Sequence, residues 1–435
     1  MRIEEMAIQA EKAQIKCAVL STEEKNRALS YIVEALKKNE TLICEENQKD
    51  MVDFEKAGGA LPLLKRLKFQ DEKIAATCRG LEDVKKLPDP VGRVIGARLL
   101  DEGLELRQVT CPIGLIGMIF ESRPDALVQI AGLTLKSGNA VILKGGSEAG
   151  RTNRLLSHII AEASREAGVP EGWIQLAETR EDVKEMLSLS EHIDLLIPRG
   201  SNEFVRYIMT NTSIPVLGHA DGVTHMYVHS SADAEMAVEL VDDSKNQYVA
   251  VCNALETLLV DGAIAARFIP ALAQRMRERG TELRGCPRAR SYAEMNEATE
   301  EDWRTEYLEA ILSVRVVDSL DEAIEHINTY GSGHTDAIVS ADAEAAEYFM
   351  NMVDSAGVFW NSSTRFADGY RYGLGAEVGI STNKIHARGP VGLDGLCIYK
   401  WKLYGQGQKV ADYTGPEGRP FLHKDITSDS GQEGV

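Results

Sequence analysis

The stretch LIGMIFESRPDALVQIAGLTLKSGNAVILK, Leu115 to Lys144, indicates how this chain folds. Its two ends, Leu115 to Phe120 and Ala140 to Lys144, are apolar runs of strand length. Between them, Asp125 to Lys136 repeats apolar residues at helical spacing. A strand, a helix and a second strand in this order are typical of a parallel βαβ unit. We therefore predict an α/β fold with parallel sheets.

The same alternation continues along the chain in two runs. The first run carries further strands at Ile193 to Ile197 and Met226 to Val228, with helices at Arg151 to Ala167 and Asn202 to Met209. The second run has predicted strands at Thr257 to Val260, Ile311 to Val317, Thr335 to Val339 and Val358 to Trp360, and helices at Ala263 to Arg279, Asp321 to Asn328 and Ala343 to Val353. A chain of 435 residues exceeds what one hydrophobic core usually spans, so we expect two α/β domains.

The segments before and after the two α/β runs have different sequence patterns. Apolar residues recur at helical spacing from Met6 to Ile43, which predicts an all-helical start that closes near residue 60. Val94 to Leu99 and Leu104 to Val109 flank Asp101-Glu102-Gly103, a pattern typical of a β-hairpin. The segment after about Asp412 is polar and rich in Gly and Pro, as in disordered tails.

The composition limits the partners and the compartment. A net charge of −19 repels polyanions, so we expect neither nucleic acid nor an anionic membrane surface as a partner. No apolar stretch is long enough to span a bilayer, and the N-terminus lacks the apolar region of a signal peptide. The seven cysteines show no C-x-x-C pair and no disulfide or zinc spacing. These features predict a cytoplasmic protein without a metal centre.

Cys252 is the candidate nucleophile. It lies in QYVAVCNALETLL, Gln247 to Leu259, between a predicted amphipathic helix and a short apolar strand. A thiolate at such a turn can attack an activated acyl group while backbone N–H groups stabilise the oxyanion. A lone cysteine among apolar neighbours is also a common core residue, and the periodicity by itself leaves both interpretations open.

Two segments at strand ends are candidate sites for phosphate groups, because ligands of open parallel sheets collect there. Lys144 ends its strand and is followed by Ser147 and Glu148, a set that suits the ribose or 2′-phosphate of a dinucleotide. Pro-Arg-Gly-Ser, Pro198 to Ser201, ends another strand at a predicted helix N-terminus, where free N–H groups favour an anion.

A phosphate loop of the Walker A type is the alternative for the first segment. VILKGGSEAGRT, Val141 to Thr152, places G-x-x-x-x-G-R-T between a strand and a helix, and LLVD, ending at Asp261, resembles a Walker B strand. Arg151 stands where such loops need a lysine, and a planar guanidinium does not replace that compact charge. The alternative function is therefore that of a P-loop NTPase.

Several motifs together resemble the γ-glutamyl phosphate reductase family of the aldehyde dehydrogenase superfamily. The resemblance runs from about residue 5 to residue 411, and its most discriminating stretch is VDSLDEAIEHINTYGSGHTDAI, Val317 to Ile338. The other motifs are CPIGLIGMIFESRPDA, LKSGNAVILKGGSEA, PRGS, VLGHADGVTHMYV, VCNALETLL, STRFADG and GLGAEVGISTNKIHARGPVGLDGL.

The resemblance implies an aldehyde dehydrogenase-like fold with a β-hairpin arm used for oligomerisation. The implied parts are a cofactor-binding domain at 1–98 and 113–225, a catalytic domain at 226–390, the arm at 99–112 and 391–411, and a polar tail at 412–435. The implied activity is the NADPH-dependent reduction of L-glutamyl 5-phosphate to L-glutamate 5-semialdehyde, with release of phosphate, in proline synthesis from glutamate. The implied partners are further copies of the chain and glutamate 5-kinase, which would hand over the substrate.

The same resemblance implies roles for individual residues. Cys252 matches the superfamily nucleophile, and Lys144 and Glu306 match residues that bind the adenosine and nicotinamide riboses. With them we assign Gly145, Ser147, Arg199, Gly200 and Ser201 to the cofactor. Because a chain of this charge must pair small anions locally, we expect the substrate to meet Arg123 and Arg365, with Asn253, Asn361 and Ser363.

A hydrolytic aldehyde dehydrogenase is the remaining alternative. In such enzymes a glutamate of an E-L-G-G loop activates water, but the corresponding region, Ile214 to Gly222, holds no Glu. Ser122 stands where the superfamily usually has an oxyanion-binding Asn, which leaves the second oxyanion donor open. The sequence also suggests no carboxylate partner for His225 or His229, so we interpret them, with His219, as structural or substrate-contacting residues.

Overall fold

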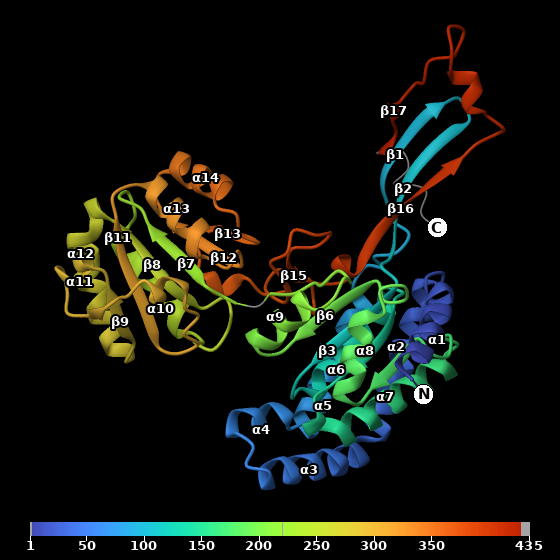
Figure 1. Ribbon diagram of the computed structural model, residues 1–435, viewed down its shortest axis with the longest axis horizontal. Helices are drawn as coiled ribbons and strands as arrows, with labels where there is room; N and C mark the ends of the chain where they lie inside the picture. The colour runs from blue at the N-terminus through green and yellow to red at the C-terminus, as the bar shows by residue number, and fades with distance from the viewer. Residues whose placement is uncertain (1, 220, 428–435) are drawn as a thin grey trace.

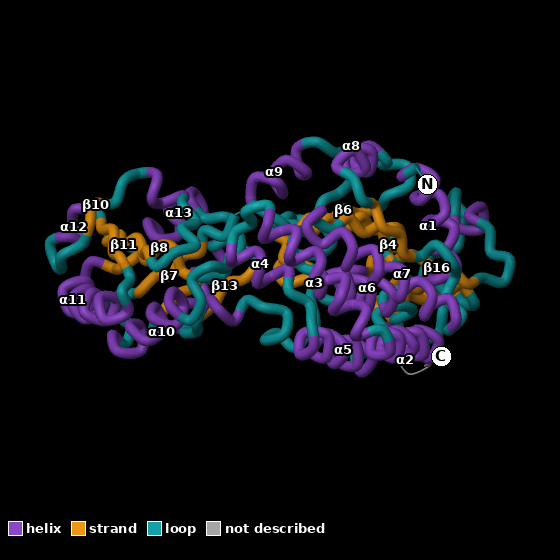
Figure 2. The backbone as a smooth tube through the Cα atoms, turned by 90° about the horizontal axis from the view of Figure 1, so that it is seen from below, coloured by secondary structure: helices purple, strands orange, loops and turns teal. Residues whose placement is uncertain are grey.

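The structure is a computed structural model that describes residues 2–219 and 221–427. Figure 1 shows two α/β units side by side, with a narrow sheet standing out from them as an arm. Figure 2 shows that each unit has helices on both faces of its sheet. No helix in the described part of the chain is both long and apolar enough to cross a membrane.

The chain begins with helices that pack on the first α/β unit. They are α1 Ile3–Cys17, α2 Thr22–Lys38, α3 Glu40–Lys56, α4 Leu61–Leu67 and α5 Asp71–Lys86. Helix α2 starts with a reciprocal cap, in which Ser21 Oγ accepts the Glu24 N–H and the Glu24 carboxylate accepts the Ser21 N–H. The predicted all-helical start is confirmed, although helices continue past residue 60.

The first unit contains a parallel sheet in the order β5-β4-β3-β6. Its strands are β3 Leu115–Phe120, β4 Ala140–Lys144, β5 Ile174–Ala177 and β6 Leu195–Arg199. The helices are α6 Pro124–Lys136, α7 Gly150–Glu166, α8 Arg180–Ser188 and α9 Asn202–Thr210, and a short 3-10 turn, Ser147–Ala149, follows β4. All residues of β3 and β4 are buried, because helices cover both faces of a parallel sheet. The predicted βαβ unit is confirmed.

The second unit contains a parallel sheet in the order β10-β9-β11-β8-β7-β12-β13. Its strands are β7 Thr224–Val228, β8 Leu255–Asp261, β9 Glu282–Gly285, β10 Asn296–Glu297, β11 Ile311–Val317, β12 Thr335–Val339 and β13 Gly357–Trp360. Its helices are α10 Ala234–Asn246, α11 Gly262–Arg279, α12 Pro287–Arg290, α13 Leu320–Tyr330 and α14 Ala343–Met352, with 3-10 turns at Glu301–Arg304 and Thr364–Phe366.

Alternate residues of the central strands face opposite layers of this unit. Met226 and Leu258 join one apolar core with residues of α10 and α11, whereas Tyr227 and Leu259 join a second core with residues of α13 and α14. Side chains of a strand alternate between its faces, so a wholly apolar strand can serve both layers. This packing determines the positions of the loops at the two ends of the strands.

The arm is an antiparallel sheet in the order β16-β2-β1-β17. Strands β1 Val94–Asp101 and β2 Leu104–Pro112 form the predicted hairpin, and β16 Cys397–Tyr404 pairs along β2. The expectation of a disordered tail is wrong for residues 412–427. A 3-10 turn at Val410–Tyr413 leads the chain back, and β17 Lys424–Asp425 pairs with β1. The remaining tail, 428–435, lies outside the described residues.

Two predicted boundaries need correction. The chain returns to the first unit well before residue 390, because Val378 and Val391 are buried in the core of that unit. The small antiparallel sheet of β14 Gly379–Ser381 and β15 Gly389–Val391 lies in this returning segment, and a 3-10 turn at Asp394–Leu396 follows it. Strand β1 also extends the arm back to Val94, inside the segment predicted for the cofactor domain.

Candidate active site

Cys252 lies in the turn between α10 and β8, where the sequence places it. Hydrogen bonds from two threonine side chains to backbone carbonyls hold the turn. Thr224 Oγ1 donates to the Cys252 carbonyl at 3.0 Å, and Thr364 Oγ1 donates to the Asn253 carbonyl at 2.8 Å. Asn253 Nδ2 donates to the Ala367 carbonyl at 2.8 Å. Asn253 thus anchors the turn to the segment after β13.

The thiol of Cys252 is held in its neutral form. Its pKa is raised to about 12, mainly by burial and then by the nearby carboxylates of Glu306 and Glu377, while Arg365 acts in the opposite direction. At neutral pH the sulfur therefore carries its proton, and a nucleophilic role needs a group that removes it.

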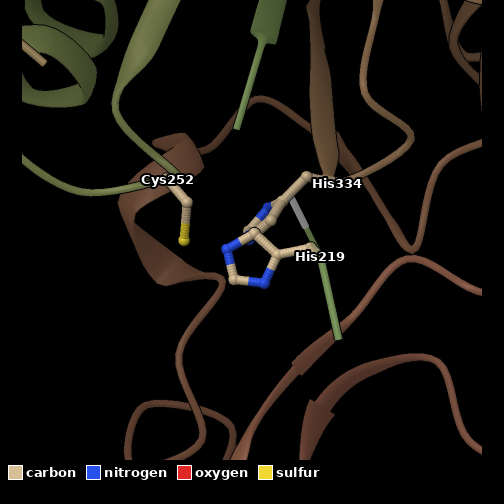
Figure 3. Close-up of side chains that lie close together, drawn as sticks. All are labelled: His219, Cys252 and His334. Carbon is tan, nitrogen blue, oxygen red and sulfur yellow. The ribbon is translucent and has the colours of Figure 1, made fainter. Parts of the chain in front are cut away.

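Two histidines lie beside this sulfur. Figure 3 shows His219 and His334 next to Cys252, and one donor atom from each of the three residues lies within 4.8 Å of the others. Sulfur and imidazole are ligands that zinc prefers. A metal ion held by all three would occupy the sulfur that acyl chemistry needs, so we assign no metal ion to the cluster.

Of the other two candidate histidines, only His225 differs from the interpretation made from the sequence. His225 does have a carboxylate partner, because its Nδ1 lies 3.1 Å from Asp336 Oδ1 and both side chains are fully buried. His229 follows the end of β7, and its Nδ1 lies 2.9 Å from Ser231 Oγ. The partner of His225 comes from the neighbouring strand β12, which local sequence patterns do not reveal.

Arg365 is a buried cation near Cys252. Its Nε donates to Gln247 Oε1 at 2.9 Å, and no carboxylate of the described residues pairs with it. Burial lowers the pKa of its guanidinium. Ser363 Oγ accepts the Arg365 N–H at 3.3 Å and the Ser244 hydroxyl at 3.2 Å. Ser363 therefore positions Arg365, and the guanidinium is available to a substrate anion.

Arg199 and Arg123 form a second basic group. Burial lowers the pKa of Arg199, and the charge of Arg123 lowers it further, while the carboxylate of Glu377 acts in the opposite direction. Arg123 is half exposed and its Nη2 lies 3.1 Å from Asp125 Oδ2. The ionised form of the Cys252 thiol would act in the same direction as Glu377, so Arg199 lies in the neighbourhood of the candidate nucleophile.

The structure contradicts the assignment of Asn361 to the substrate. Asn361 follows β13, at the carboxyl-terminal edge of the sheet, whereas Cys252 precedes the amino-terminal end of β8. Its Oδ1 accepts the Ser340 N–H and its Nδ2 donates to the Ser340 carbonyl, both at 2.9 Å. Asn361 has φ 51°, a conformation that asparagine tolerates better than most residues. It ties the end of β13 to that of β12.

A cavity of about 690 Å³ opens at the carboxyl-terminal ends of β3 and β4. Lys144 and Ser147 line it, as do Thr179, Arg180 and Lys184, and its apolar walls include Phe54, Leu63, Val183, Phe204 and Tyr207. Lys144 is buried and donates to the Gly145 carbonyl, and no carboxylate within the described ranges forms an ion pair with it. A Cβ on Gly145 would lie 2.1 Å from Asn153 Nδ2, so this glycine lets β4 approach α7.

The N-terminus of α9 holds a carboxylate from the protein itself. Glu121 Oε2 accepts the Ser201 N–H at 3.3 Å, and a Cβ on Gly200 would lie 2.9 Å from the same oxygen. The free N–H groups at this end attract an anion, as the sequence predicts. In this structure Glu121 supplies it.

Glu306 connects the second unit to α9 of the first unit. Its Oε2 accepts a hydrogen bond from Asn202 Nδ2 at 2.6 Å, next to Ser201. Glu306 is also close enough to Cys252 to raise the pKa of the thiol. It therefore lies between the nucleophile and the segment assigned to the cofactor.

Ser122 points away from an oxyanion role. Its N–H and hydroxyl both donate to Glu148 Oε1, at 2.6 and 2.7 Å. Its backbone has a positive φ of 45°, and the residue lines the cavity beside Lys144. The second oxyanion donor is therefore not Ser122 in this arrangement.

Comparison with known proteins supports the assignment of this centre. The model of the aldehyde dehydrogenase family matches residues 1–283 and 296–376. A γ-glutamyl phosphate reductase of Pelotomaculum thermopropionicum is 58% identical over 431 residues, covering 99% of each chain. One of Acetivibrio thermocellus is 58% identical over 413 residues, covering 95% of this chain and 96% of the relative. This chain belongs to the γ-glutamyl phosphate reductases of the aldehyde dehydrogenase family.

A solved structure supports the same family. The crystal structure of γ-glutamyl phosphate reductase from Thermotoga maritima superposes with a TM-score of 0.92 at 39% identity, covering 94% of this chain and all of the other. The predicted aldehyde dehydrogenase-like α/β fold is thereby confirmed. Aldehyde dehydrogenases use nicotinamide cofactors, and the cavity beside Lys144 in the first unit is the candidate site for one.

The P-loop alternative is wrong for this aldehyde dehydrogenase. Arg151 lies 3.2 Å from Asp50 and 2.8 Å from Asp53 on α3, and Thr152 Oγ1 donates to Asp50 Oδ2 at 2.8 Å. The two side chains that would have to bind phosphate and magnesium instead join α7 to α3. The carboxylates that capture them lie far away in the sequence, which explains why the local motif misleads.

The sequence assigned no role in the reaction to three residues that lie near Cys252. His219 and His334 meet at Cys252 from separate segments, and Glu377 reaches it from the segment that returns to the first unit. The sequence held a signal for His219, because it lies in the loop Ile214 to Gly222, which corresponds to the loop that carries the catalytic glutamate of hydrolytic aldehyde dehydrogenases. Nothing in the local pattern around Glu377 distinguishes it from a solvated acid.

Proposed function

We propose that the protein reduces L-glutamyl 5-phosphate to L-glutamate 5-semialdehyde, with NADPH as reductant and release of phosphate, in the synthesis of proline from glutamate. The observation that carries the proposal is the neutral thiol of Cys252 beside a buried guanidinium, Arg365, that has no carboxylate partner among the described residues. A thiol and an unpaired cation together suit an acyl phosphate, which brings an electrophilic carbon and an anionic leaving group. Relatives of the same name, 58% identical over nearly the full length, supply the substrate class.

The chemistry starts at the sulfur. Cys252 attacks the acyl carbon, the C–O bond to phosphate breaks, and a thioester forms on the enzyme. The backbone N–H groups of the turn are the candidate donors to the oxyanion, since Ser122 is turned toward Glu148. Arg365, with Arg199, is placed to hold the departing phosphate or the substrate carboxylate.

The residues around the cavity fit a dinucleotide. The ammonium group of Lys144 lines the cavity without an ion pair among the described residues, and apolar side chains in the same lining suit an adenine ring. Lys144, Ser147, Arg199, Gly200, Ser201 and Glu306 would hold the cofactor. When bound, the reduced nicotinamide supplies the hydride that turns the thioester into the aldehyde.

The preference for NADPH over NADH rests on charge. Arg180 and Lys184 line the same cavity as Lys144, together with Glu121, Glu148 and Glu178, and these three cations are the candidate partners of a 2′-phosphate. A charge-assisted hydrogen bond to a phosphate is about twice as strong as a neutral one. The neutral 2′-hydroxyl of NADH would gain much less binding free energy from these cations.

The arm supports an oligomer. Strand β16 forms one edge of the arm sheet and exposes apolar side chains along its length. They are Ile398, Tyr399, Trp401, Leu403 and Tyr404. An exposed edge with this composition is typical of a surface that another copy covers. We assign the protein to the cytoplasm and expect its substrate to come from glutamate 5-kinase, because an acyl phosphate has to be used before water cleaves it.

An assay in the reverse direction tests the function. Glutamate 5-semialdehyde, phosphate and NADP should give NADPH, and omission of any one of the three should stop steady turnover. Replacement of glutamate semialdehyde by simple aldehydes should lower the rate sharply. Absence of turnover with all three present, from a folded protein, would contradict the proposal.

A further inference from the structure

The proton of the Cys252 thiol has to leave before the sulfur can attack. With burial raising the pKa of this thiol to about 12, water at neutral pH removes the proton too rarely to support catalysis. The loop from Ile214 to Gly222 contributes no carboxylate base other than Asp221, whose Oδ2 lies 2.5 Å from Arg206. Another group close to the sulfur therefore has to accept the proton.

The ring of His219 has a defined orientation. Its Nδ1 lies 3.1 Å from the carbonyl oxygen of Ile380 on β14. A carbonyl oxygen can only accept, so Nδ1 carries the hydrogen and Nε2 of the neutral ring keeps a free lone pair. Figure 3 shows a ring nitrogen of His219 on the side that faces the Cys252 sulfur.

His334 limits the movement of this ring. Its side chain is 1% exposed, and the two rings meet edge to face with centroids 5.0 Å apart and an interplanar angle of 72°. Its Nδ1 lies 2.8 Å from Thr335 Oγ1, and its buried Nε2 has no partner within the described ranges. His334 thus packs against His219 without competing for the Ile380 carbonyl.

We propose that Nε2 of His219 accepts the proton of the Cys252 thiol, directly or through one water, and that His334 is a positioning residue for the His219 ring. The spacing fits this role, because a water with two ordinary hydrogen bonds bridges atoms that lie up to about 4.8 Å apart. The donor atoms of the cluster lie within that span. The inference rests on the proposed function, since an acyl phosphate substrate is what the thiolate attacks.

The proton balance is complete within the reaction. In acylation the sulfur bonds to the acyl carbon, the carbon–oxygen bond to phosphate breaks, and the thiol proton passes through His219 to the leaving phosphate, which departs as hydrogen phosphate. In reduction the thioester becomes aldehyde and thiol after gain of a hydride and a proton. The net reaction consumes one proton, and His219 ends unchanged.

The charges around the pair keep the acceptor neutral. Burial lowers the pKa of His219, and Arg199 lowers it further, while Glu306, Asp221 and the Ile380 carbonyl act in the opposite direction. Burial also lowers the pKa of the neighbouring His334, to about 3. The His219 ring therefore stays neutral, and able to accept a proton, down to pH values below the usual range of histidine, although the same shift makes it a weaker base.

The first experiment measures the reactivity of the Cys252 thiol in the absence of cofactor and substrate. The rate of alkylation of Cys252 by iodoacetamide is recorded against pH for the full-length protein, for His219→Ala and for His158→Ala, a control in which an exposed histidine of α7 is removed. We expect alkylation of His219→Ala at neutral pH to fall at least tenfold and to recover in part with added imidazole, with no change in the control. A rate within twofold of the parent, or a loss that imidazole does not affect, would overturn the proposal.

The second experiment measures the rate at which the thioester forms on Cys252. Glutamate semialdehyde and NADP are mixed with each protein without phosphate, and the rate of the single NADPH burst is followed. His219→Ala should slow the burst about a hundred- to ten-thousandfold, and imidazole should restore part of the rate. His334→Asn should slow it less and respond little to imidazole. If the parent gives no burst the proposed function fails, whereas an unchanged burst in His219→Ala removes only the role of His219.

A conservative variant guards against a folding defect. His219→Gln keeps an N–H that can donate to the Ile380 carbonyl but has no basic nitrogen. It should retain the melting temperature and NADPH binding of the parent and show the same slow burst. A fast burst in this variant would assign His219 a structural role and overturn the proposal.

Discussion

Gly222 and Cys252 are in contact through their backbones. A Cβ placed on Gly222 would lie 2.4 Å from the Cα and 2.5 Å from the Cβ of Cys252, and 2.3 Å from its carbonyl oxygen. The atoms that it would meet belong to Cys252 itself, so only a glycine allows the loop between α9 and β7 to pass this close to the nucleophile. The same loop carries His219.

Gly222→Ala should therefore damage catalysis more than folding. We expect the Cys252 turn to shift by up to an ångström and kcat to fall at least about a hundredfold, because misplacement of this size disrupts near-attack geometry. Gly80→Ala is the matched control, since Gly80 lies inside α5 with open space around it, and it should stabilise the protein by up to about 1 kcal/mol. Equal kcat values for the two variants would show that the contact does not matter.

Cys252→Ala should fold normally and lose turnover by several orders of magnitude. Removal of the sulfur removes the only atom that can carry the thioester, whereas the backbone contacts of the turn stay. Cys44→Ala, at a half-buried cysteine on α3, should keep most of the activity. Steady-state assays with circular dichroism as a folding check decide the point, and parent-like rates from Cys252→Ala would disprove the mechanism.

Lys144→Ala should raise the Michaelis constant for NADPH about ten- to a hundredfold and that for NADH less, because the ammonium group should count most against a 2′-phosphate. Lys86→Ala, which removes an exposed lysine of α5, should change neither constant. Titration of both cofactors by fluorescence gives the same comparison without turnover. Equal losses for NADPH and NADH would show that Lys144 does not read the phosphate.

Oxidation of glutamate semialdehyde should depend on added phosphate, with arsenate able to replace it. The loop from Ile214 to Gly222 holds no glutamate to activate water, while phosphate is already an anion and needs no deprotonation. Without either anion we expect one burst of NADPH, equal to the enzyme concentration, and then no turnover. Steady formation of free glutamate in phosphate-free buffer would show that a base, His219 included, activates water at the thioester.

Lys245 and Glu256 form a fully buried ion pair with 2.6 Å between Nζ and Oε2. Lys245→Met leaves the carboxyl alone and should cost about 3–5 kcal/mol of unfolding free energy at pH 8. Burial raises the pKa of Glu256 to about 7 even in the intact protein. An acid whose pKa is raised on folding binds its proton more tightly in the native state, so stability falls as pH rises from the unfolded value of about 4.5.

The loss in Lys245→Met should therefore shrink at pH 5.5, where the lone carboxyl can be protonated. Denaturant unfolding of the variant and the parent at both pH values measures this difference. Lys49→Met, at an exposed pair with Glu46, should show almost no loss at either pH. A loss in Lys245→Met that does not change with pH would mean that Glu256 stays charged or finds another donor.

Local patterns in the sequence determined the α/β class, the order of most strands and helices, the hairpin around Gly103 and the turn that carries Cys252. Periodicity is a property of residues that are close in the sequence, so it can be recognised without knowledge of the fold. It failed where the elements are very short, as for β5, β9 and β10, and where a polar tail gains its order only by pairing with β1. The functional class came from motifs and their resemblance to a family.

The tertiary structure alone decided which of these residues meet. It brought His219 and His334 to Cys252, placed Glu121 on the N-terminus of α9, gave Arg151 to Asp50, and separated Asn361 from the nucleophile by the length of a strand. Each of these relations joins segments far apart in the chain, and each depends on sheet order and on which strand end a loop leaves. Those are set by the packing of whole layers around buried cores, a property that no short window of sequence contains.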